Sequence, residues 1–495
     1  MAQINVLALD YGASSGRAIA GSYDGRSLSL RELHRFANEP VSMRGTLYWD
    51  LPRLYHEMKA GLVKAAADGG FASVGIDTWG VDFGLIDKAG KLLSLPVHYR
   101  DSRTDGILTK AYERIAREKL YELTGIQTME INTAFQLLAL AEQDPGLLQA
   151  ADKLLLMPDL LAWLLTGADG AERSIASTTQ LLDVRTGDWS EEVMQALGID
   201  RRIFGAVVDS GQMRGPATAD LLSELGIPAF DVVSVCGHDT QSAMAAVPAK
   251  QKDFIFISCG TWSLFGTELD EACAGEKAAA LNLSNETGYD GKISFLKNIT
   301  GLWLIQESRR EWMREGQTFG FGALEEMART AEPLRSFIDP DEPAFVPAGD
   351  VPERIREYCA RTGQAKPESI AQIVRCIDES LALKYRRTLE EIQACTGRDY
   401  GVIHLVGGGA QSALLCRMTA NACRIPVIAG PVEATVYGNC AVQLISRGEL
   451  SGLAQARDLI SASPDIKVYE PDPDAASAGA WDEAYGRFCR MLETK

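Results

Sequence analysis

This sequence has few of the residues from which metal centres are built. No cysteine precedes Cys236, and the ten cysteines include no Cys-x-x-Cys pair. There are only five histidines and no His-Glu-x-x-His motif, so zinc chemistry is disfavoured. The irregular spacing of the cysteines predicts reduced thiols buried in the core, which is typical of proteins of the reducing cytoplasm.

A basic surface and long apolar runs are also absent. The 49 Lys and Arg residues against 67 Asp and Glu give a net charge of −18, which repels nucleic acid and anionic membranes. The leucine-rich stretch 154–165 is interrupted by Pro158 and is too short to cross a bilayer. The N-terminus lacks the basic region of a signal peptide. We expect a cytoplasmic monomer or small homo-oligomer that acts on small molecules, with no nucleic-acid or membrane partner.

Two common phosphate-binding motifs are missing. No Gly-Lys pair is followed by Ser or Thr, and no Gly-x-Gly-x-x-Gly follows a predicted strand, which disfavours P-loop and dinucleotide-binding chemistry. The hydrophobic fraction of 46% is nevertheless ordinary for a globular protein, and 495 residues suggest two or three domains.

The first strands form a pattern that returns about half a chain later. An apolar run ends at Asp10, a small-residue turn follows, and two further strand candidates surround an Asp24-Gly25 hairpin. The second copy is an apolar strand at 254–258 that runs into Gly260-Thr261-Trp262-Ser263. The repeat predicts two related lobes, which we place at residues 1–244 and 245–495.

The turn from Gly12 to Arg17 has three possible interpretations. Its glycines and serines could present N–H and hydroxyl donors to phosphate, or the segment could be a plain hairpin. It also matches the Gly-x-Ser-x-Gly nucleophile elbow of hydrolases, but that motif requires a helix after it, whereas this sequence predicts a strand.

Acidic residues stand where two predicted strands end. Asp239 follows the predicted strand 231–236 and opens a helix, so it is either a helix cap or a general base, with His238 and Thr240 beside it. Asp10 ends the first strand and is either a strand-end cap or a ligand that holds Mg²⁺ through water.

Two further segments admit both a binding and a structural interpretation. Asp77, Trp79 and Asp82 could bind a sugar through an aromatic face and carboxylates, or could form a polar turn after a strand. The triplet Gly407-Gly408-Gly409 could let a base or ribose approach the backbone closely, or could simply lead into a helix.

Taken in order, these segments resemble the FGGY carbohydrate kinase family of the actin-like ATPase superfamily. The resemblance spans essentially the whole chain, and within the family it is closest to kinases of L-rhamnulose. The segments that carry it are 10–17, 75–83, 99–104, 238–240, 260–263, 296–299 and 429–434.

The resemblance implies an α/β fold of two ribonuclease-H-like lobes around a cleft. It implies transfer of phosphate from ATP, with Mg²⁺, to O1 of L-rhamnulose, or to another ketose such as L-fuculose or L-xylulose. An actin-like filament or chaperone module is the non-enzymatic alternative. Asp239 is the implied catalytic base and Asp10 the metal ligand. The implied sugar-binding residues are Gly80, His238, Asp239, Thr240 and Asn298; the implied nucleotide-binding residues are Ala13, Ser14, Ser15, Gly16, Arg17, Thr261, Gln306 and Gly408.

Overall fold

The chain divides into two compact units. The computed structural model describes residues 3–463 and 465–493. Unit 1 comprises Met1–Pro248, Leu269–Phe295 and Ala434–Ala462, and unit 2 comprises Ala249–Glu268, Leu296–Glu433 and Ser463–Lys495. Each unit is built on a mixed β-sheet with α-helices packed against it, so the α/β prediction is confirmed.

Unit 1 contains the N-terminal strands, the acidic strand ends and two segments from later in the chain. Its strands are β1 (Ile4–Tyr11), β2 (Ser15–Tyr23), β3 (Leu28–Ala37), β4 (Val41–Met43), β5 (Thr46–Tyr48), β6 (Ser73–Thr78), β7 (Phe83–Ile86), β8 (Lys153–Leu156), β9 (Ala171–Glu172), β10 (Val207–Val208), β11 (Met213–Pro216), β12 (Asp231–Val233) and β15 (Ser284–Thr287). Its α-helices are α1 (Leu51–Ala67), α2 (Ile107–Arg114), α3 (Arg117–Thr124), α4 (Thr133–Gln143), α5 (Pro145–Ala150), α6 (Met157–Thr166), α7 (Arg173–Ser177), α8 (Glu191–Leu197), α9 (Ala219–Leu225), α10 (Asp239–Ala245), α11 (Glu276–Ala280), α17 (Ala434–Ser446) and α18 (Leu453–Ile460).

The unit 1 sheet brings the predicted acidic strand ends to one edge. Its strand order is β11-β12-β6-β1-β2-β3, with β1 parallel to β6 and β6 parallel to β12. The carboxyl ends of parallel strands meet at the same edge. Asp10 is the register partner of Asp77, and Thr78 forms an isolated parallel bridge with His238. The strand predicted at 231–236 ends earlier, at Val233.

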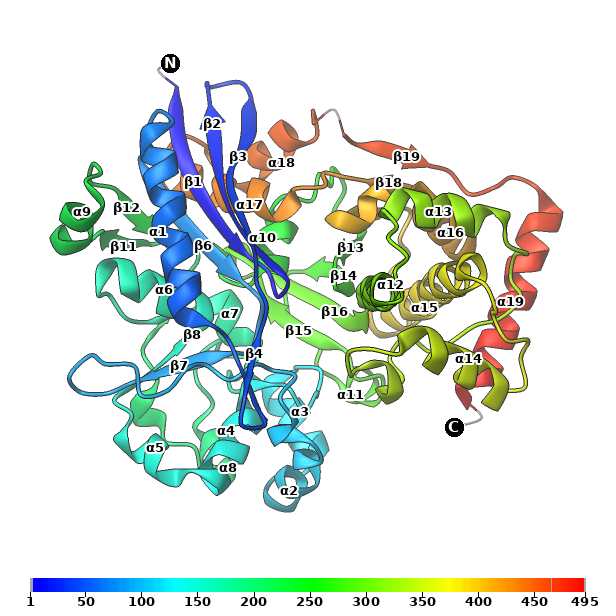
Figure 1. Cartoon of the computed structure of the whole chain (residues 1–495), viewed down its shortest axis with the longest axis horizontal. Helices are drawn as coiled ribbons and strands as arrows, with labels where there is room; N and C mark the ends of the chain where they lie inside the picture. Colours follow the sequence, from blue (N-terminus) through cyan, green and yellow to red (C-terminus); the bar gives the residue numbers. More distant parts are fainter. Residues whose placement is uncertain (1–2, 464, 494–495) are drawn as a thin grey trace. The chain divides into compact units, whose positions relative to one another are not determined.

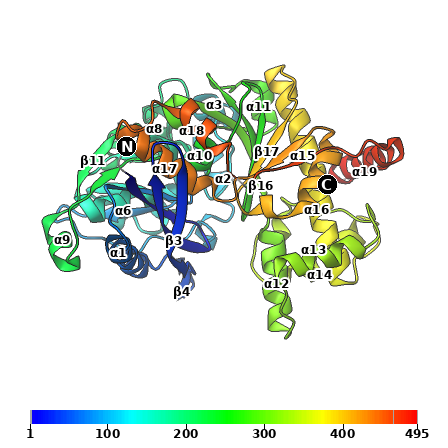
Figure 2. The same ribbon diagram turned by 90° about the horizontal axis from the view of Figure 1, so that it is seen from above.

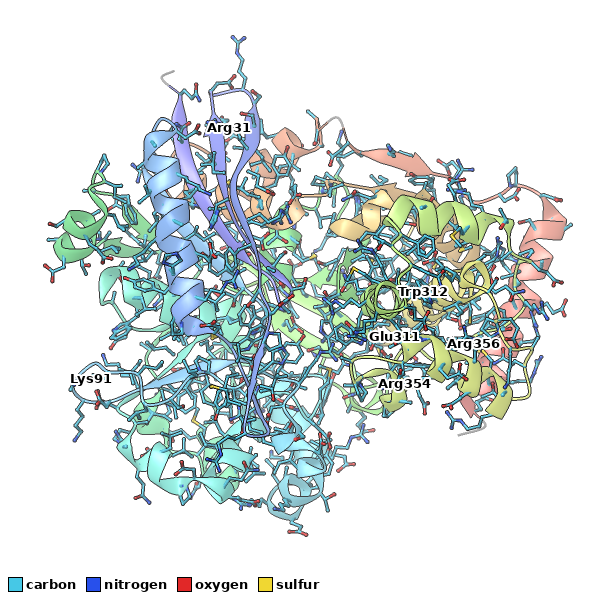
Figure 3. All side chains as sticks on the ribbon, in the orientation of Figure 1. Arg31, Lys91, Glu311, Trp312, Arg354 and Arg356 are labelled. Atoms are coloured by element: carbon cyan, nitrogen blue, oxygen red, sulfur yellow. The ribbon has the colours of Figure 1, made fainter. Side chains whose placement is uncertain are left out.

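Helices from distant parts of the sequence cover the two faces of this sheet. Helix α1 packs on β2 and β3, and α17 packs on β1 and β6 from the other side (Figures 1 and 2). An ion pair between strand and helix adds to the first packing, since Arg31 on β3, labelled in Figure 3, binds Asp68 at the C-cap of α1. The apolar seam under α17 contains Val6, Ala8 and Ile19 against Val436 and Leu444.

Two glycines allow α17 to approach closely. A Cβ added to Gly75 on β6 would lie 2.4 Å from the side-chain oxygen of Asn439, and one added to Gly438 would lie 1.7 Å from the backbone oxygen of Ser242 in α10. Neither distance is possible between non-bonded atoms, so both positions require glycine. Helix α17 is thereby packed against both the strand that bears Asp77 and the helix that begins at Asp239.

Unit 2 has a comparable arrangement. Its strands are β13 (Ile255–Cys259), β14 (Trp262–Leu269), β16 (Ile293–Thr300), β17 (Ile403–Val406), β18 (Val427–Ala429) and β19 (Lys467–Tyr469). Its α-helices are α12 (Trp303–Arg314), α13 (Phe321–Thr330), α14 (Val351–Arg361), α15 (Ile370–Thr396), α16 (Ala413–Cys423) and α19 (Ala475–Glu493). Within this unit the strand order is β16-β14-β13-β17-β18-β19, with β13 and β14 antiparallel and β13 parallel to β17.

The hairpin predicted to repeat is therefore present in both sheets. The pairs β1–β2 and β13–β14 are both antiparallel hairpins. In each hairpin a buried first strand leads into a short turn of glycine and small residues, and the second strand follows that turn.

Seven of the ten cysteines are buried, and all ten are free thiols. Over residues 3–463 and 465–493, none of the helices has the length and apolar character of a membrane span.

We predict that Gly438→Ala destabilises the protein by about 1–3 kcal/mol or more, because the added methyl group must displace the backbone of α10. Gly479→Ala in α19 is the matched control, since nothing lies within 4 Å of the Cβ it would add. That control gains helix propensity and should raise stability by up to about 1 kcal/mol. Chemical unfolding of both variants measures the difference; equal stabilities would contradict the close packing.

Candidate active site

Three carboxylates gather at the carboxyl edge of the unit 1 sheet. Asp10 lies at the end of β1, Asp77 near the end of β6, and Asp239 begins the helix that follows β12. Register partners in a sheet project their side chains to the same face, so Asp10 and Asp77 lie side by side. Arg17, the partner of Asp10 on β2, forms an ion pair with it.

Asp77 is the most deeply buried of the three. It is fully buried, and its Oδ2 accepts a hydrogen bond of 2.5 Å from Asn439 Nδ2. Its Oδ1 is buried with no hydrogen-bond partner. Burial raises the pKa of Asp77 well above its ordinary value, and the carboxylates of Asp10 and Asp239 raise it further, against the lowering effect of the Asn439 hydrogen bond.

Asp239 differs because part of it reaches solvent. Its side chain is 32% exposed, and its Oδ1 accepts a hydrogen bond of 3.2 Å from the hydroxyl of Thr240. His238 occupies the N-cap position and no side chain caps α10, so helix capping does not account for the carboxylate. Burial raises the pKa of Asp239, and Asp10 adds to the rise, while His238 lowers it. A carboxylate with a raised pKa is a better proton acceptor near neutral pH.

The backbone before Asp239 is held by two buried side chains, Glu172 at the N-cap of α7 and Ser174 in its first turn. Oε2 of Glu172 accepts from the N–H of Gly237 at 2.8 Å, and the hydroxyl of Ser174 accepts from the N–H of His238 at 3.2 Å. The same Glu172 oxygen also receives the Ser174 hydroxyl at 2.6 Å. These bonds fix the direction in which α10 begins, and with it the position of Asp239.

His238 lies between two carboxylates. Its Nδ1 is 3.2 Å from Oε2 of Glu286 on β15, and its Nε2 is 3.6 Å from Oδ1 of Asp239. Burial alone would lower the pKa of His238, but the contact with Glu286 and the charge of Asp239 outweigh it and raise the pKa above its ordinary value. The charge of Glu286 therefore stabilises the imidazole in its protonated form.

Gly80 follows β6 beside a set of stacked aromatic rings. A Cβ at Gly80 would lie 3.3 Å from the Thr178 hydroxyl, so little room exists there for a side chain. Trp49 stacks on Trp79 with ring centroids 3.9 Å apart and on His98 at 4.1 Å. Both indole N–H groups donate to Oδ2 of Asp82, at 2.6 and 2.9 Å. These two hydrogen bonds fix the indole rings relative to Asp82. Because Asp82 is also fully buried, its carboxylate is not available to bind a sugar hydroxyl.

The first glycine turn leaves donors available. The N–H of Gly12 donates to the carbonyl of Ser15, and Asn38 donates to the carbonyls of Gly12 and Ser14 at 2.9 and 3.1 Å. Within the described residues, the N–H groups of Ala13 and Ser14 have no protein partner. An exposed turn whose carbonyls are bound and whose N–H groups are available suits an anion.

The hydrolase interpretation of this turn is wrong. Gly16 lies in β2, and the chain continues as a strand to Tyr23, whereas a nucleophile elbow requires a helix there. Gly16 is needed for packing, because a Cβ would lie 2.1 Å from the ring of Phe36.

In unit 2, the second hairpin turn meets a helix and the glycine triplet. The hydroxyl of Thr261 donates to Oε1 of Gln306 on α12 at 3.3 Å, and the carbonyl of Gly260 accepts from the N–H of Leu302 at 2.9 Å. A Cβ at Gly408 would lie 4.0 Å from the carbonyl of Cys259, at the start of the same turn. Thr261, Gln306 and Gly408, which are far apart in the sequence, therefore surround the end of β13.

The acidic edge of unit 1 fits a hydrated divalent cation better than a closed protein cage. Among the described side chains, no group of three or more His, Cys, Asp or Glu residues could hold a metal ion by itself. Mg²⁺ normally keeps several water ligands and uses one or two carboxylates together with substrate phosphates. Asp10 beside the unpartnered Oδ1 of Asp77 provides such carboxylates.

Comparison with known proteins assigns the family. Residues 5–246 match the N-terminal domain, and residues 255–447 the C-terminal domain, of the FGGY family of carbohydrate kinases. The chain belongs to the FGGY family of carbohydrate kinases. The family resemblance noted from the sequence motifs is thus confirmed, and the filament or chaperone alternative is set aside.

Individual relatives agree with this assignment. The kinase is 44% identical over 485 residues to the rhamnulokinase of Bacteroides thetaiotaomicron, with 98% of each chain covered. Among solved structures it is similar in fold to a ligand-bound xylulose kinase from Lactobacillus acidophilus (TM-score 0.81, 14% identity, 99% and 98% of the chains). It is also similar to Plasmodium falciparum glycerol kinase with ADP (TM-score 0.77, 15% identity, 99% and 98%).

Several site residues have no signal in the local sequence. The structure brings the predicted residues Asp10, His238, Asp239 and Thr240 together in unit 1, and Thr261, Gln306 and Gly408 together in unit 2. Asn298 is on β16 in unit 2. The sequence reading missed three positioning residues, Glu172, Glu286 and Asn439, because each contacts a residue at least 48 positions away.

We predict that Glu286→Gln lowers the pKa of His238 by about one to three pH units, because it removes the charge nearest to the imidazole. NMR titration of the histidine rings measures this, and five histidines keep the spectrum assignable. Glu224→Gln, which removes an exposed carboxylate paired with Lys59, should leave the His238 pKa unchanged. An unaltered pKa in Glu286→Gln would show that Glu286 does not control this imidazole.

Proposed function

We propose that this kinase transfers the terminal phosphate of ATP to O1 of L-rhamnulose, giving L-rhamnulose 1-phosphate and ADP. The observation that carries the proposal is the 44% identity, over nearly the whole of both chains, to a rhamnulokinase. The unit 1 site supports it, since a partly exposed carboxylate stands beside a buried imidazole at the head of a helix. We place the reaction in the cytoplasm, because ten cysteines that form no disulfide suit a reducing compartment.

Asp239 is the general base in this proposal. It would accept the proton of the O1 hydroxyl as the oxygen attacks the terminal phosphorus, and its raised pKa suits that transfer. His238, whose protonated form Glu286 stabilises, and Thr240 would bind neighbouring hydroxyls of the ketose. Gly80, beside the aromatic rings, and Asn298 would complete the sugar contacts, and residues 1–244 would form the sugar-binding lobe.

The two hairpin turns bind the nucleotide. The available N–H groups of Ala13 and Ser14, with the hydroxyl groups of Ser14 and Ser15, would bind phosphate oxygens. Gly16 shapes this turn, and Arg17 acts through Asp10, to which it is bound. In the nucleotide-binding lobe, residues 245–495, the proposed contacts are Thr261, Gln306 and Gly408. Binding by local N–H donors resolves the conflict between an anionic substrate and a chain of net charge −18.

Mg²⁺ would be held through its water shell by Asp10. When bound, the ion neutralises charge on the phosphate groups of ATP. The protein residues supply positioning and proton transfer, which is most of what phosphoryl transfer requires from an enzyme.

A ketose panel tests the substrate. We expect ADP release, measured with a coupled assay, to depend on added sugar and to give the highest kcat/KM with L-rhamnulose, above L-fuculose and L-xylulose. Phosphorus NMR of the product should show the ester at C1. A higher kcat/KM for L-fuculose or L-xylulose would assign the enzyme to that ketose, and sugar-independent turnover would contradict the proposal.

We predict that Asp239→Asn folds normally but loses at least about a hundredfold in kcat, because an amide cannot accept the proton. Asp220→Asn is a matched control, since Asp220 also lies in the first turn of a helix but is exposed on α9. Its kcat should stay within about twofold of wild type. Near-normal turnover of Asp239→Asn would remove Asp239 from the role of base.

A further inference from the structure

A row of buried polar side chains connects α17 to Asp77. Asn439 Nδ2 donates to Asp77 Oδ2 at 2.5 Å, and Asn439 Oδ1 accepts from Gln443 Nε2 at 2.7 Å. Gln443 also donates to the carbonyl of Leu7 at 3.0 Å and accepts from the Ser73 hydroxyl at 2.8 Å. Asn439, Gln443 and Ser73, here called the amide row, are all fully buried.

The amide row can adopt only one orientation. The carbonyl of Leu7 can only accept a hydrogen bond, so the nitrogen of Gln443 must face it. That nitrogen also donates to Asn439, so the Asn439 oxygen faces Gln443 and the Asn439 nitrogen faces Asp77. The row therefore always presents a donor to Asp77 Oδ2, and the plane of the carboxyl group is set by α17.

This orientation leaves one Asp77 oxygen for another partner. Oδ1 is buried and has no hydrogen-bond partner. Asp77 is the strand partner of Asp10, and both carboxyl groups project to the same face of the sheet. A buried carboxylate oxygen without a partner is unfavourable, and a neighbouring carboxylate makes it more so. Protonation of Asp77 relieves both costs, as does a cation whose water ligands lie between the two carboxyl groups.

We propose that Asp77 is a second carboxylate of the Mg²⁺ site beside Asp10, binding a water of the hydrated ion through Oδ1, and that Asn439 is the residue that positions it. The inference rests on the proposed function in one respect, that the ion enters with the nucleotide. It does not depend on which ketose is phosphorylated. The apolar neighbours of Asn439 on α17 pack the sheet, whereas its amide sets the direction of a metal-binding oxygen.

Metal binding without turnover tests the proposal. Mn²⁺ is titrated into the full-length protein saturated with ADP, and free Mn²⁺ is read by electron paramagnetic resonance. In Asp77→Asn the side-chain oxygen still accepts from Asn439, so the amide row stays intact while the charge is lost. We expect Mn²⁺ affinity to fall about tenfold to a hundredfold, with ADP affinity in metal-free buffer unchanged. Asn439→Ala should weaken Mn²⁺ binding in the same direction.

Ser73→Ala is the matched control. It shortens the far end of the amide row but leaves the bond between Asn439 and Asp77 in place, so Mn²⁺ affinity should stay within about twofold of wild type. Equal Mn²⁺ affinity in wild type and Asp77→Asn would overturn the inference, as would failure of the ADP-saturated wild type to bind Mn²⁺. Failure to phosphorylate L-rhamnulose, with metal binding intact, would count against the proposed substrate alone.

Discussion

The site depends on a close contact between helix α17 and the unit 1 sheet. Gly75 and Gly438 bring the helix nearer to β6 and α10 than any side chain would allow. One helix from the last eighth of the chain thereby packs against the strand that carries Asp77 and the helix that begins at Asp239. These two elements are separated by about 160 residues of sequence. The N–H of Thr78 at the end of β6 donates to the carbonyl of Gly237 just before α10, and α17 packs on both elements, so their relation is fixed by direct pairing and by this helix.

Placing three carboxylates together has an electrostatic cost that the surrounding residues reduce. Arg17 neutralises Asp10, the Asn439 amide stabilises Asp77, and His238 stabilises Asp239. Each partner comes from a different element, so the charges are compensated one at a time and the acids remain close. Burial is the main reason why the pKa values of Asp77 and Asp239 stay raised despite these partners, and the neighbouring carboxylates add to the rise.

The sequence predicted the parts of the site that have a local pattern. Asp10 and Asp239 could be singled out because each stands where a short apolar strand ends. That they lie at the same edge of one sheet follows from the parallel pairing of β1, β6 and β12, which strand periodicity does not predict. The strand predicted after Gly16 argued against a hydrolase nucleophile elbow, and β2 confirms that strand. Asn439 and Glu286 could not be found in this way, because an amide in a helix and an acid in a strand have no distinguishing local pattern. Their roles arise from tertiary contacts, and the apolar face of α17 predicts only a buried helix.

The acids at this edge have different surroundings, and these separate their chemical roles. Asp77 is fully buried and one of its oxygens is bound by an amide that cannot rotate away, so it cannot reach a substrate hydroxyl. Asp239 retains about a third of its side-chain exposure and begins a helix whose backbone is fixed by Glu172. A base must meet an incoming hydroxyl group, whereas a metal-side carboxylate needs only to reach a water molecule. Burial, more than pKa, therefore supports the proposal that Asp239 accepts the proton and that Asp10 and Asp77 face the cation.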